Sequence, residues 1–225
     1  MALKLYMHPV STVSRPVRLF IAEKRLPVTE QVVDLMTGAH HQPEYVAINP
    51  NKAVPALEDG DFRMTESSAI LKYLAARFEA PEYPKDLEER AAVDSAMDWF
   101  NTGFYRDFGY GLVYPQIFPH HKRPTHEQQS GTVAWGKTKA RDWLAVLEQN
   151  IIGRNDYVAN NRISIADYFG VCLLTAGELV ACRFEDYPNI RRWIGNMKKL
   201  GSWEQTNEVM YGFAGSMAGQ AFENM

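Results

Sequence analysis

The stretch Asn49-Pro50-Asn51-Lys52-Ala53-Val54-Pro55-Ala56-Leu57-Glu58-Asp59-Gly60, followed by Thr65-Glu66-Ser67-Ser68, decides the fold. Pro55 opens an apolar segment and has no backbone N–H, so it is predicted at the first residue of a strand or in a turn. An X-Pro bond in such a turn is often cis. A cis bond after Val54 would turn the Val54 N–H and C=O outward, where an extended peptide can pair with them.

The second motif, Thr65-Glu66-Ser67-Ser68, is predicted to end a strand and begin a helix. The first turn of a helix leaves backbone N–H groups unpaired, and these groups attract an anion. The two motifs together predict a site for a small peptide that carries a carboxylate.

The residues around these motifs predict a mixed sheet with helices. Alternating or apolar segments favour strands, Pro16 is suited to the first turn of a helix, and Asp59-Gly60-Asp61 is a strong hairpin signal. Strands are expected at about residues 3–7, 28–35, 53–58 and 62–65, and helices at 14–24 and 67–78, with a short helix in the loop before residue 53. This order, βαβ-α-ββα, is a thioredoxin-like layout.

The composition changes after Phe78, where two prolines and four charges between Glu79 and Asp86 are typical of a linker. Beyond it no segment has a strand pattern. A helix is expected over 87–108 and continues past 109–111 with a bend. Further helices are expected over 127–150 and from 187 onward, with a loop at 115–124. Ser164 and Asp167 form an N-terminal capping box. The predicted fold class is therefore α/β plus all-α, with a thioredoxin-like domain at 1–79, a linker at 80–86 and an all-helical domain at 87–225.

Composition excludes several classes of function. The chain has 225 residues and a net charge of -3, so it offers no basic surface for nucleic acid. No uncharged apolar run reaches the roughly 18 residues that span a bilayer, and the amino end lacks the apolar core of a signal peptide. The expected location is cytoplasmic. Cys172 and Cys182 are expected to be buried small hydrophobic residues, since ten residues of one helix would separate them too far for a disulfide.

From about residue 3 to 200 the sequence resembles the cytosolic glutathione S-transferases. In that family a valine before a cis-proline pairs with the cysteinyl backbone of glutathione, and a Glu/Gln-Ser pair holds its γ-glutamyl end. Val54-Pro55 and Glu66-Ser67 match both motifs. The resemblance implies glutathione as co-substrate and a homodimer, in which Asp94 or Asp98 could reach the neighbour's ligand.

The loop after the first strand should hold the group that activates the glutathione thiol. A thiol has a pKa near 8.5, and lowering it by about two units takes about 2.7 kcal/mol, the size of a charge-assisted hydrogen bond plus a helix N-terminus. In the Ser-type enzymes of the theta and delta classes, which this chain resembles, the active serine stands four residues before an arginine. Ser11 and Arg15 reproduce that spacing, so Ser11 is the predicted catalytic residue. Ser14 is the alternative, although it also suits the N-cap of the helix.

The glycyl end of glutathione is expected near His40 and Lys52. Both match positions that contact the glycyl carboxylate in theta-like enzymes, and a cation suits that role. The pairs His40-His41 and His120-His121 do not have metal-ligand spacing with cysteine or carboxylate partners, so no metal is expected.

The second substrate is expected between the two domains. The aromatic residues predicted to line its pocket are Phe104, Tyr105, Phe108 and Tyr110. Aromatic residues at helical spacing also fit a core, and the pattern alone does not separate the two uses. The tail at 210–219 is apolar and rich in glycine without a clean period, so it fits a lid over this pocket or an ordered strap.

The predicted function is that of a glutathione S-transferase, in which a serine hydroxyl steadies the thiolate while it attacks a small hydrophobic electrophile. Other activities of the same fold are a glutathione-dependent isomerase, dehalogenase or peroxidase, and a non-catalytic glutathione-binding protein. The signature of the zeta-class isomerases resembles Ser-Ser-Cys at this position of the loop. The corresponding residues here, Ser11-Thr12-Val13, lack that cysteine.

Overall fold

The computed structural model describes residues 3–159 and 161–225. The amino-terminal half contains β1 (Leu3–Met7), α1 (Arg15–Lys24), β2 (Val28–Val32), η1 (Ala39–His41), α2 (Pro43–Val46), β3 (Ala56–Asp59), β4 (Phe62–Thr65) and α3 (Ser67–Arg77). The sheet has the order β2-β1-β3-β4, with β1 parallel to β2 and β3 antiparallel to both of its neighbours. This is the predicted thioredoxin-like layout. The strand expected at 28–35 ends at Val32, and the one expected at 53–58 begins only at Ala56.

The hairpin between β3 and β4 forms where the sequence predicts it. Asp59 pairs with Phe62, so Gly60 and Asp61 make a two-residue turn. Gly60 has a φ of 61°, in the left-handed region that two-residue hairpin turns require. On β1, Leu3, Leu5 and Met7 are buried and face the core, because alternate residues of a strand point to one side of the sheet.

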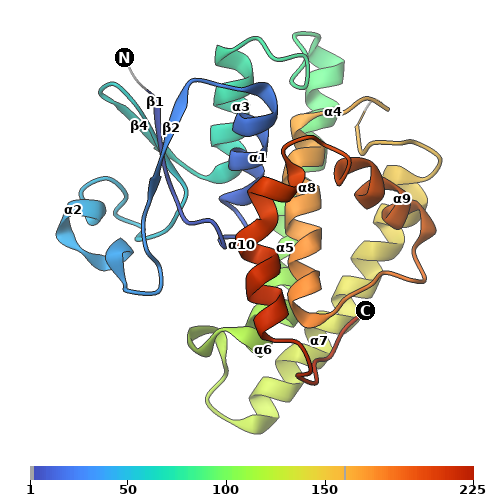
Figure 1. Cartoon of the computed structure of the whole chain (residues 1–225). Coiled ribbons are helices and arrows are strands. Elements are labelled where there is room, and N and C mark those ends of the chain that lie inside the picture. Colours follow the sequence, from blue (N-terminus) through green and yellow to red (C-terminus); the bar gives the residue numbers. More distant parts are fainter. Residues whose placement is uncertain (1–2, 160) are drawn as a thin grey trace.

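The carboxyl half is helical in Figure 1, where it lies beside the sheet half. Its elements are α4 (Leu87–Asp98), η2 (Trp99–Phe104), α5 (Tyr105–Asp107), η3 (Phe108–Val113), α6 (Tyr114–Ile117), η4 (Pro119–His121), α7 (His126–Val146), η5 (Leu147–Ile152), α8 (Ile165–Leu174), η6 (Thr175–Val180), α9 (Pro188–Met197) and α10 (Trp203–Ser216). None of the described residues from 87 onward lies in a strand. The predicted fold class is confirmed.

The helix expected at 87–108 runs without interruption to Ile117 and contains two π-helical segments, η2 and η3. The prediction of a loop at 115–124 is therefore wrong for residues 115–117, which are helical. Pro115 lies in the first turn of α6, where a missing N–H removes little hydrogen bonding. Because a π turn holds more residues than an α turn, the two π segments change which side chains share a face of this helix.

The centre of the helical half is α8, which is buried from Ile165 to Leu174. Its capping box forms as predicted: Asp167 accepts hydrogen bonds from the N–H and the hydroxyl of Ser164. Asp167 also accepts from the Trp193 indole N–H and thereby links α8 to α9. Cys172 and Cys182 are buried and free, as expected, although only Cys172 lies in α8.

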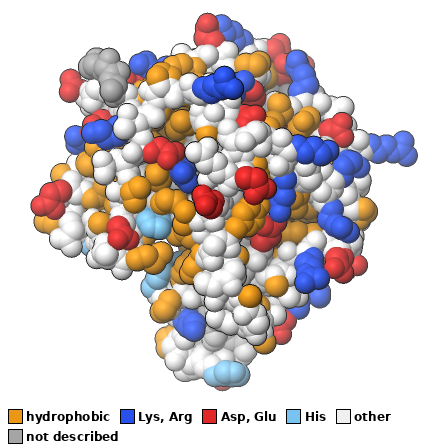
Figure 2. Space-filling model, in the orientation of Figure 1, with side chains coloured by type: hydrophobic (Ala, Val, Ile, Leu, Met, Phe, Trp, Pro, Cys, Tyr) orange, Lys and Arg blue, Asp and Glu red, His pale blue; other side chains and the backbone are white. Residues whose placement is uncertain are grey.

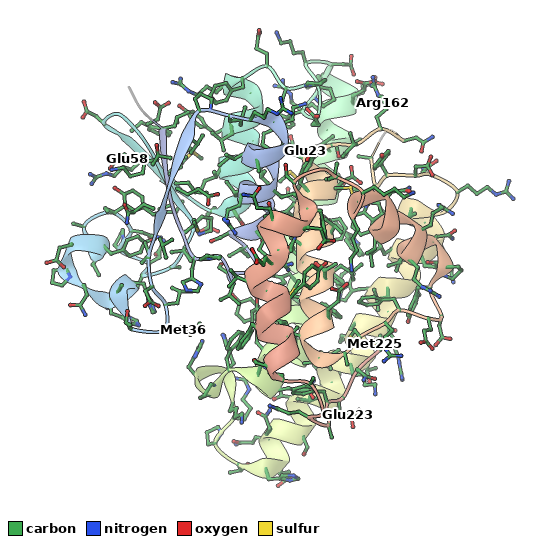
Figure 3. The ribbon with its side chains drawn as sticks, in the orientation of Figure 1. Glu23, Met36, Glu58, Arg162, Glu223 and Met225 are labelled. Carbon is green, nitrogen blue, oxygen red and sulfur yellow. The ribbon has the colours of Figure 1, made fainter. Side chains whose placement is uncertain are left out.

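The tail forms more regular structure than its sequence predicts. Residues 203–216 form α10, which packs against α1; its start is fixed where the Ser202 N–H donates to Glu23 at 3.0 Å (Figure 3). The remaining residues follow the outside of α6 and α7. Gln116 and the Glu223 main chain exchange two hydrogen bonds of 2.9 and 2.8 Å, and Lys137 pairs with the Glu223 carboxylate at 2.8 Å.

The visible surface carries mixed charge. Figure 2 shows Lys and Arg side chains interspersed with Asp and Glu over the face drawn, in keeping with the net charge of -3. No helix among the described residues is long and apolar enough to cross a membrane.

Candidate active site

A cavity of about 440 Å³ lies between the sheet domain and the first long helix. Its walls are Val13, Asn49, Asn51, Ala53, Val54, Pro55, Thr65, Glu66, Ser67, Asn101, Tyr105, Arg106 and Tyr110. The motifs Val54-Pro55 and Glu66-Ser67 therefore meet in one cavity.

The edge of this cavity at Val54 is held in a fixed shape. The Val54-Pro55 bond is cis, as predicted. The preceding carbonyl, of Ala53, accepts hydrogen bonds from the Tyr45 hydroxyl at 2.6 Å and from the Asn49 amide at 2.7 Å. Burial raises the pKa of Tyr45 to about 12, so this hydroxyl stays a donor. Among the described residues, the Val54 N–H and C=O have no hydrogen-bond partner, and an extended ligand could pair with them.

The opposite wall is the start of α3. Glu66 precedes the helix with φ 67° and ψ 107°, a conformation that residues other than glycine seldom adopt. It exposes its carboxylate at the cavity, while Ser67 beside it is buried. Strained residues cluster at ligand sites, because the surrounding fold must hold them in place. The Glu66 charge also acts on Tyr110 across the cavity: it raises the pKa of that phenol, after the larger effect of burial.

Ser11 lies in the loop between β1 and α1 and is half-buried. Its Oγ accepts the Ser14 backbone N–H at 3.3 Å, so Ser11 provides the side-chain cap of the first turn of α1. Ser14 is the N-cap residue of α1, as considered, but its Oγ makes no cap hydrogen bond and is buried without a partner among the described residues. Ser11 does not itself line the cavity, whereas Val13, two residues later, does.

His40 and Lys52 also lie outside the lining of this cavity. His40 is half-buried in η1, and its Nδ1 atom has no partner among the described residues. Burial lowers the pKa of this imidazole, and the charges of His41 and His120 lower it further. Lys52 is exposed and has a φ of 56°.

The predicted aromatic pocket divides into two pairs. Tyr105 and Tyr110 line the cavity, whereas Phe104 and Phe108 are not exposed at all and stack on each other in the core with ring centroids 4.8 Å apart. The reason is the π-helical segment η3, because residues five apart share a face of a π-helix. Tyr105 and Tyr110 therefore lie side by side, with their ring centroids 5.3 Å apart. The structure thus places Phe104 and Phe108 behind the wall of the cavity.

Asn49 and Asn101 of the wall had no role in the sequence-based prediction, which expected Asn51 near the glycyl end of glutathione and Arg106 among the aromatic residues of the pocket. Asn49 and Asn51 fix the turn before Val54, where Asn49 Oδ1 accepts the Asn51 N–H at 3.0 Å. Arg106 is held by Asp107 through hydrogen bonds of 2.9 and 3.1 Å, and this pairing lowers the pKa of the Asp107 carboxyl. The turn chemistry of Asn49-Pro50-Asn51 could have indicated Asn49. The position of Asn101 depends on the π turns, and no sequence signal indicated it.

Comparison with known proteins assigns the family. The model of the glutathione S-transferase N-terminal domain matches residues 1–76, and that of the C-terminal domain matches residues 111–200. Human glutathione S-transferase theta-1 is 33% identical over 196 residues, which cover 86% of this chain and 81% of the relative. The chain belongs to the glutathione S-transferase family. This confirms the predicted resemblance and the predicted enzyme class.

Solved structures of other glutathione transferases have the same fold. The apo form of human glutathione-S-transferase T1-1 superposes with a TM-score of 0.82 at 30% identity, covering 95% of this chain and 91% of that one. Human glutathione transferase theta-2, in a complex with glutathione and an unknown ligand, has a TM-score of 0.82 at 27% identity and covers 99% of this chain and 93% of that one.

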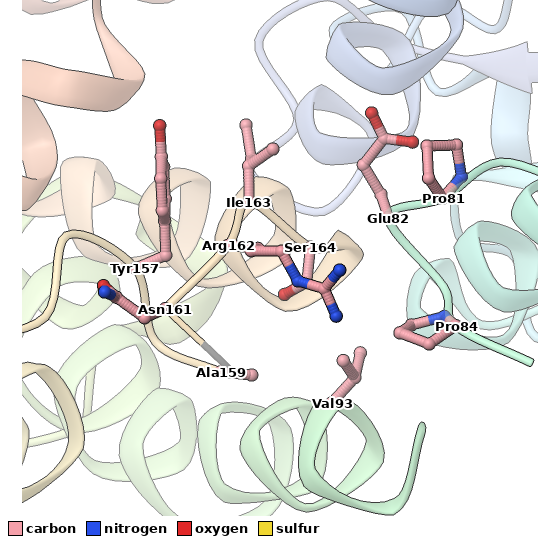
Figure 4. A pocket seen from close by; sticks show the side chains of 10 residues that line it. All are labelled: Pro81, Glu82, Pro84, Val93, Tyr157, Ala159, Asn161, Arg162, Ile163 and Ser164. Atoms are coloured by element: carbon pink, nitrogen blue, oxygen red, sulfur yellow. The ribbon is translucent and has the colours of Figure 1, made fainter. Parts of the chain in front are cut away.

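This transferase has a second cavity, of about 390 Å³, between the segment after α3 and the loop before α8 (Figure 4). It contains Glu82, Tyr157 and Arg162 but none of the predicted site residues. Among the described residues no group of three or more His, Cys, Asp or Glu side chains could hold a metal ion.

Proposed function

We propose that this chain conjugates glutathione to small hydrophobic electrophiles and that the Ser11 hydroxyl steadies the glutathione thiolate. The observation that carries the proposal is the convergence of Val54-Pro55 and Glu66-Ser67 on one cavity, next to the loop that holds Ser11. One motif offers unpaired main-chain groups and the other a helix N-terminus, which are the groups that a short peptide with a free carboxylate requires.

Glutathione would lie across the Val54 edge. Its cysteinyl backbone would pair with the free N–H and C=O of Val54, and its γ-glutamyl end would bind at Glu66 and Ser67. The exposed Glu66 carboxylate suits the γ-glutamyl ammonium, and the first turn of α3 suits its carboxylate. The glycyl carboxylate would extend toward His40 and Lys52.

Ser11 suits the thiolate because of how its hydroxyl is used. Its oxygen already accepts the Ser14 N–H, so its hydrogen remains available to donate to the sulfur. Accepting a hydrogen bond polarises the O–H bond and makes it a better donor. The start of α1 adds a positive helix end close by. The Ser14 hydroxyl is fully buried, which argues against the alternative assignment.

The electrophile would bind against the faces of Tyr105 and Tyr110, with Arg106 at the rim. Phe104 and Phe108 would support this wall from behind. Catalysis then consists of thiol activation and proximity, without a covalent enzyme intermediate.

The organisation of the chain around this site is also proposed. A sheet domain at 1–79, a linker at 80–86 and a helical domain at 87–225 agree with the end of α3 at Arg77 and the start of α4 at Leu87. A homodimer, which the resemblance to the family implies, is part of this proposal. Sedimentation of the purified chain would test this assembly.

The proposal is tested with calorimetry of glutathione binding and with conjugation of a chlorinated nitrobenzene. The wild type should bind glutathione at or below millimolar concentration and form the conjugate. Ser11→Ala should lower kcat/KM by about tenfold to a hundredfold, because a hydrogen bond to a charged group is worth about 1.5–3 kcal/mol. Ser14→Ala is the matched control and should leave the rate within about twofold. An unchanged rate in Ser11→Ala, or no binding of glutathione by the wild type, would contradict the proposal.

A further inference from the structure

A buried arginine lies at the start of α1, one helical turn after Ser11. The Arg15 side chain is fully buried. Its Nη1 atom donates to the Asn207 Oδ1 of α10 at 2.9 Å and to the Thr175 Oγ1 of η6 at 3.3 Å, and its Nη2 atom donates to the Cys172 carbonyl of α8. All three acceptors are neutral. Among the described residues, no carboxylate therefore compensates the positive charge of Arg15.

The next arginine of α1, in contrast, has a paired charge. Arg18 contacts the same part of α10, where its Nη1 atom donates to the Thr206 carbonyl at 3.1 Å. Its Nε atom lies 3.1 Å from the Glu30 carboxylate and forms an ion pair with it. A buried charge ordinarily has such a partner, because removing an ion from water is costly. Arg15 is the more deeply buried of the two arginines, yet its Nε has no hydrogen-bond partner among the described residues.

The fold fixes the orientation of the Asn207 amide. The Nδ2 atom of Asn207 donates to the Trp203 carbonyl at 2.8 Å, so its Oδ1 atom faces Arg15. Asn207 is fully buried in α10, which packs on α1 (Figure 1). An aspartate has nearly the same shape and would place a carboxylate oxygen at this point. The neutral amide thus holds the guanidinium and leaves its charge uncompensated.

Main-chain contacts join Arg15 to the turn that contains Ser11. The Ser11 carbonyl accepts the N–H groups of Ser14 and Arg15, each at 3.1 Å, and the Ser11 Oγ accepts the Ser14 N–H at 3.3 Å. The guanidinium therefore lies within one arginine side chain of this turn. Because buried charges are screened much less than exposed ones, a fixed cation here favours an anion that is bound at the turn.

We propose that Arg15 and Asn207 are positioning residues for the thiolate: the uncompensated charge of Arg15, held in place by Asn207, helps to keep the glutathione sulfur at Ser11 ionised. This inference rests on the proposed function, since it concerns glutathione bound at that turn. An unpaired buried charge lowers stability, and departures of this kind are expected at functional sites. Through Asn207, α10 of the helical half contributes to the thiolate site of the sheet half.

The test is Asn207→Asp, which keeps the shape of the side chain and adds a carboxylate next to Arg15. The pKa of bound glutathione is read from the ultraviolet absorbance of the thiolate as a function of pH. Asn207→Asp should raise this pKa by about one unit and lower kcat/KM near pH 7 by about threefold to tenfold, because less of the bound glutathione is then thiolate. The Kd of glutathione at about pH 5, where the thiol is protonated, should change by less than about twofold.

A second variant and a control separate charge from stability. Arg15→Met removes the charge and should also raise the thiol pKa by about one unit. The two variants should change the unfolding temperature in opposite directions: Arg15→Met lowers it, whereas Asn207→Asp leaves it unchanged or raises it, because the new carboxylate pairs with the buried cation. A merely structural role of Arg15 would not raise the thiol pKa in a variant that is as stable as the wild type. Asn150→Asp is the matched control, since it adds the same charge at an exposed position and should change neither quantity.

The outcomes separate this inference from the proposed function. If Ser11→Ala raises the thiol pKa while Asn207→Asp matches Asn150→Asp, the inference is wrong and the proposed function stands. A wild-type thiol pKa in Arg15→Met would likewise overturn the inference. If Asn207→Asp raises the pKa and Ser11→Ala does not, the role of Ser11 is wrong and that of Arg15 stands. A wild type that binds no glutathione, or leaves its thiol pKa unchanged, overturns both.

Discussion

Arg15 in α1 donates from Nη1 to the Asn207 Oδ1 of α10 at 2.9 Å, and so joins residues 192 positions apart in the chain. The same guanidinium donates to Thr175 and to the Cys172 carbonyl, is fully buried, and has no carboxylate within salt-bridge distance among the described residues. A buried cation held only by neutral acceptors is unusual, because burial of a charge is costly.

The first prediction concerns this contact. Arg15→Ala should lower the free energy of unfolding by about 2–4 kcal/mol, since it leaves a cavity and removes the donor from three buried acceptors. Arg15→Met restores part of the volume and should recover part of that loss. Arg191→Met, at an exposed arginine, is the control and should lie within about 0.5 kcal/mol of the wild type. Urea denaturation measures all three, and an Arg15→Ala variant as stable as the control would contradict the prediction.

A second prediction compares two glycines of α7. A Cβ atom at Gly136 would lie 2.3 Å from the Gly111 carbonyl carbon, whereas a Cβ at Gly131 would meet nothing within 4 Å. Gly136→Ala should therefore force α7 away from η3 and destabilise the protein by more than about 2 kcal/mol. Gly131→Ala should stabilise it by up to about 1 kcal/mol, because alanine is the better helix former. Equal unfolding temperatures for the two variants would count against this packing.

Glu66 supplies a third prediction, about strain. With a φ of 67°, this position suits glycine better than alanine. Glu66→Gly should therefore be more stable than Glu66→Ala by about 1 kcal/mol, within the usual cost of such a conformation. Both variants lose the carboxylate and should bind glutathione more weakly by a similar factor in calorimetry. If the alanine variant proved the more stable of the two, the strain at this position would be disproved.

The fourth prediction concerns acid pH. Burial lowers the pKa of His8, His40 and His121 below the value of about 6.5 that they have in an unfolded chain. Below pH 6.5 the unfolded chain then binds more protons than the folded one, so stability is fully present above pH 6.5 and falls as the pH drops through the folded pKa values.

The variant His121→Phe tests this pH dependence. His121 packs on Tyr114 and Tyr110, and phenylalanine keeps that packing without a titrating group. Denaturation midpoints between pH 5 and 8 should show a shallower fall in the variant. An identical slope in both proteins would exclude His121 as a contributor.

The sheet half follows closely from local sequence. The hairpin turn at Gly60, the cis bond before Pro55 and the start of α3 after Glu66 each depend on a few adjacent residues with a specific backbone preference. Such preferences act over short distances, so they can be recognised in one sequence. The capping box of α8 was predictable for the same reason.

The aromatic wall could not be predicted in this way. An α-helical period places Phe104 and Phe108 on one face, but the period does not say whether that face meets the core or the cavity. The π segments, which depend on packing against α7, bring Tyr105 and Tyr110 to the cavity instead. The helix at Trp203–Ser216 was missed because its glycines hide the period, and contact with α1 stabilises it.

The sequence by itself determined the two motifs that can bind a peptide, the order of strands and helices around them, and Ser11 as the candidate donor. Only the tertiary structure decided that the Ser11 Oγ, and not the Ser14 Oγ, accepts a hydrogen bond at the start of α1, and that Tyr105 and Tyr110 form the wall. Backbone preferences are local and can be read from neighbouring residues. The direction in which a side chain is buried depends on which distant elements pack against it, and only the folded chain brings those elements together.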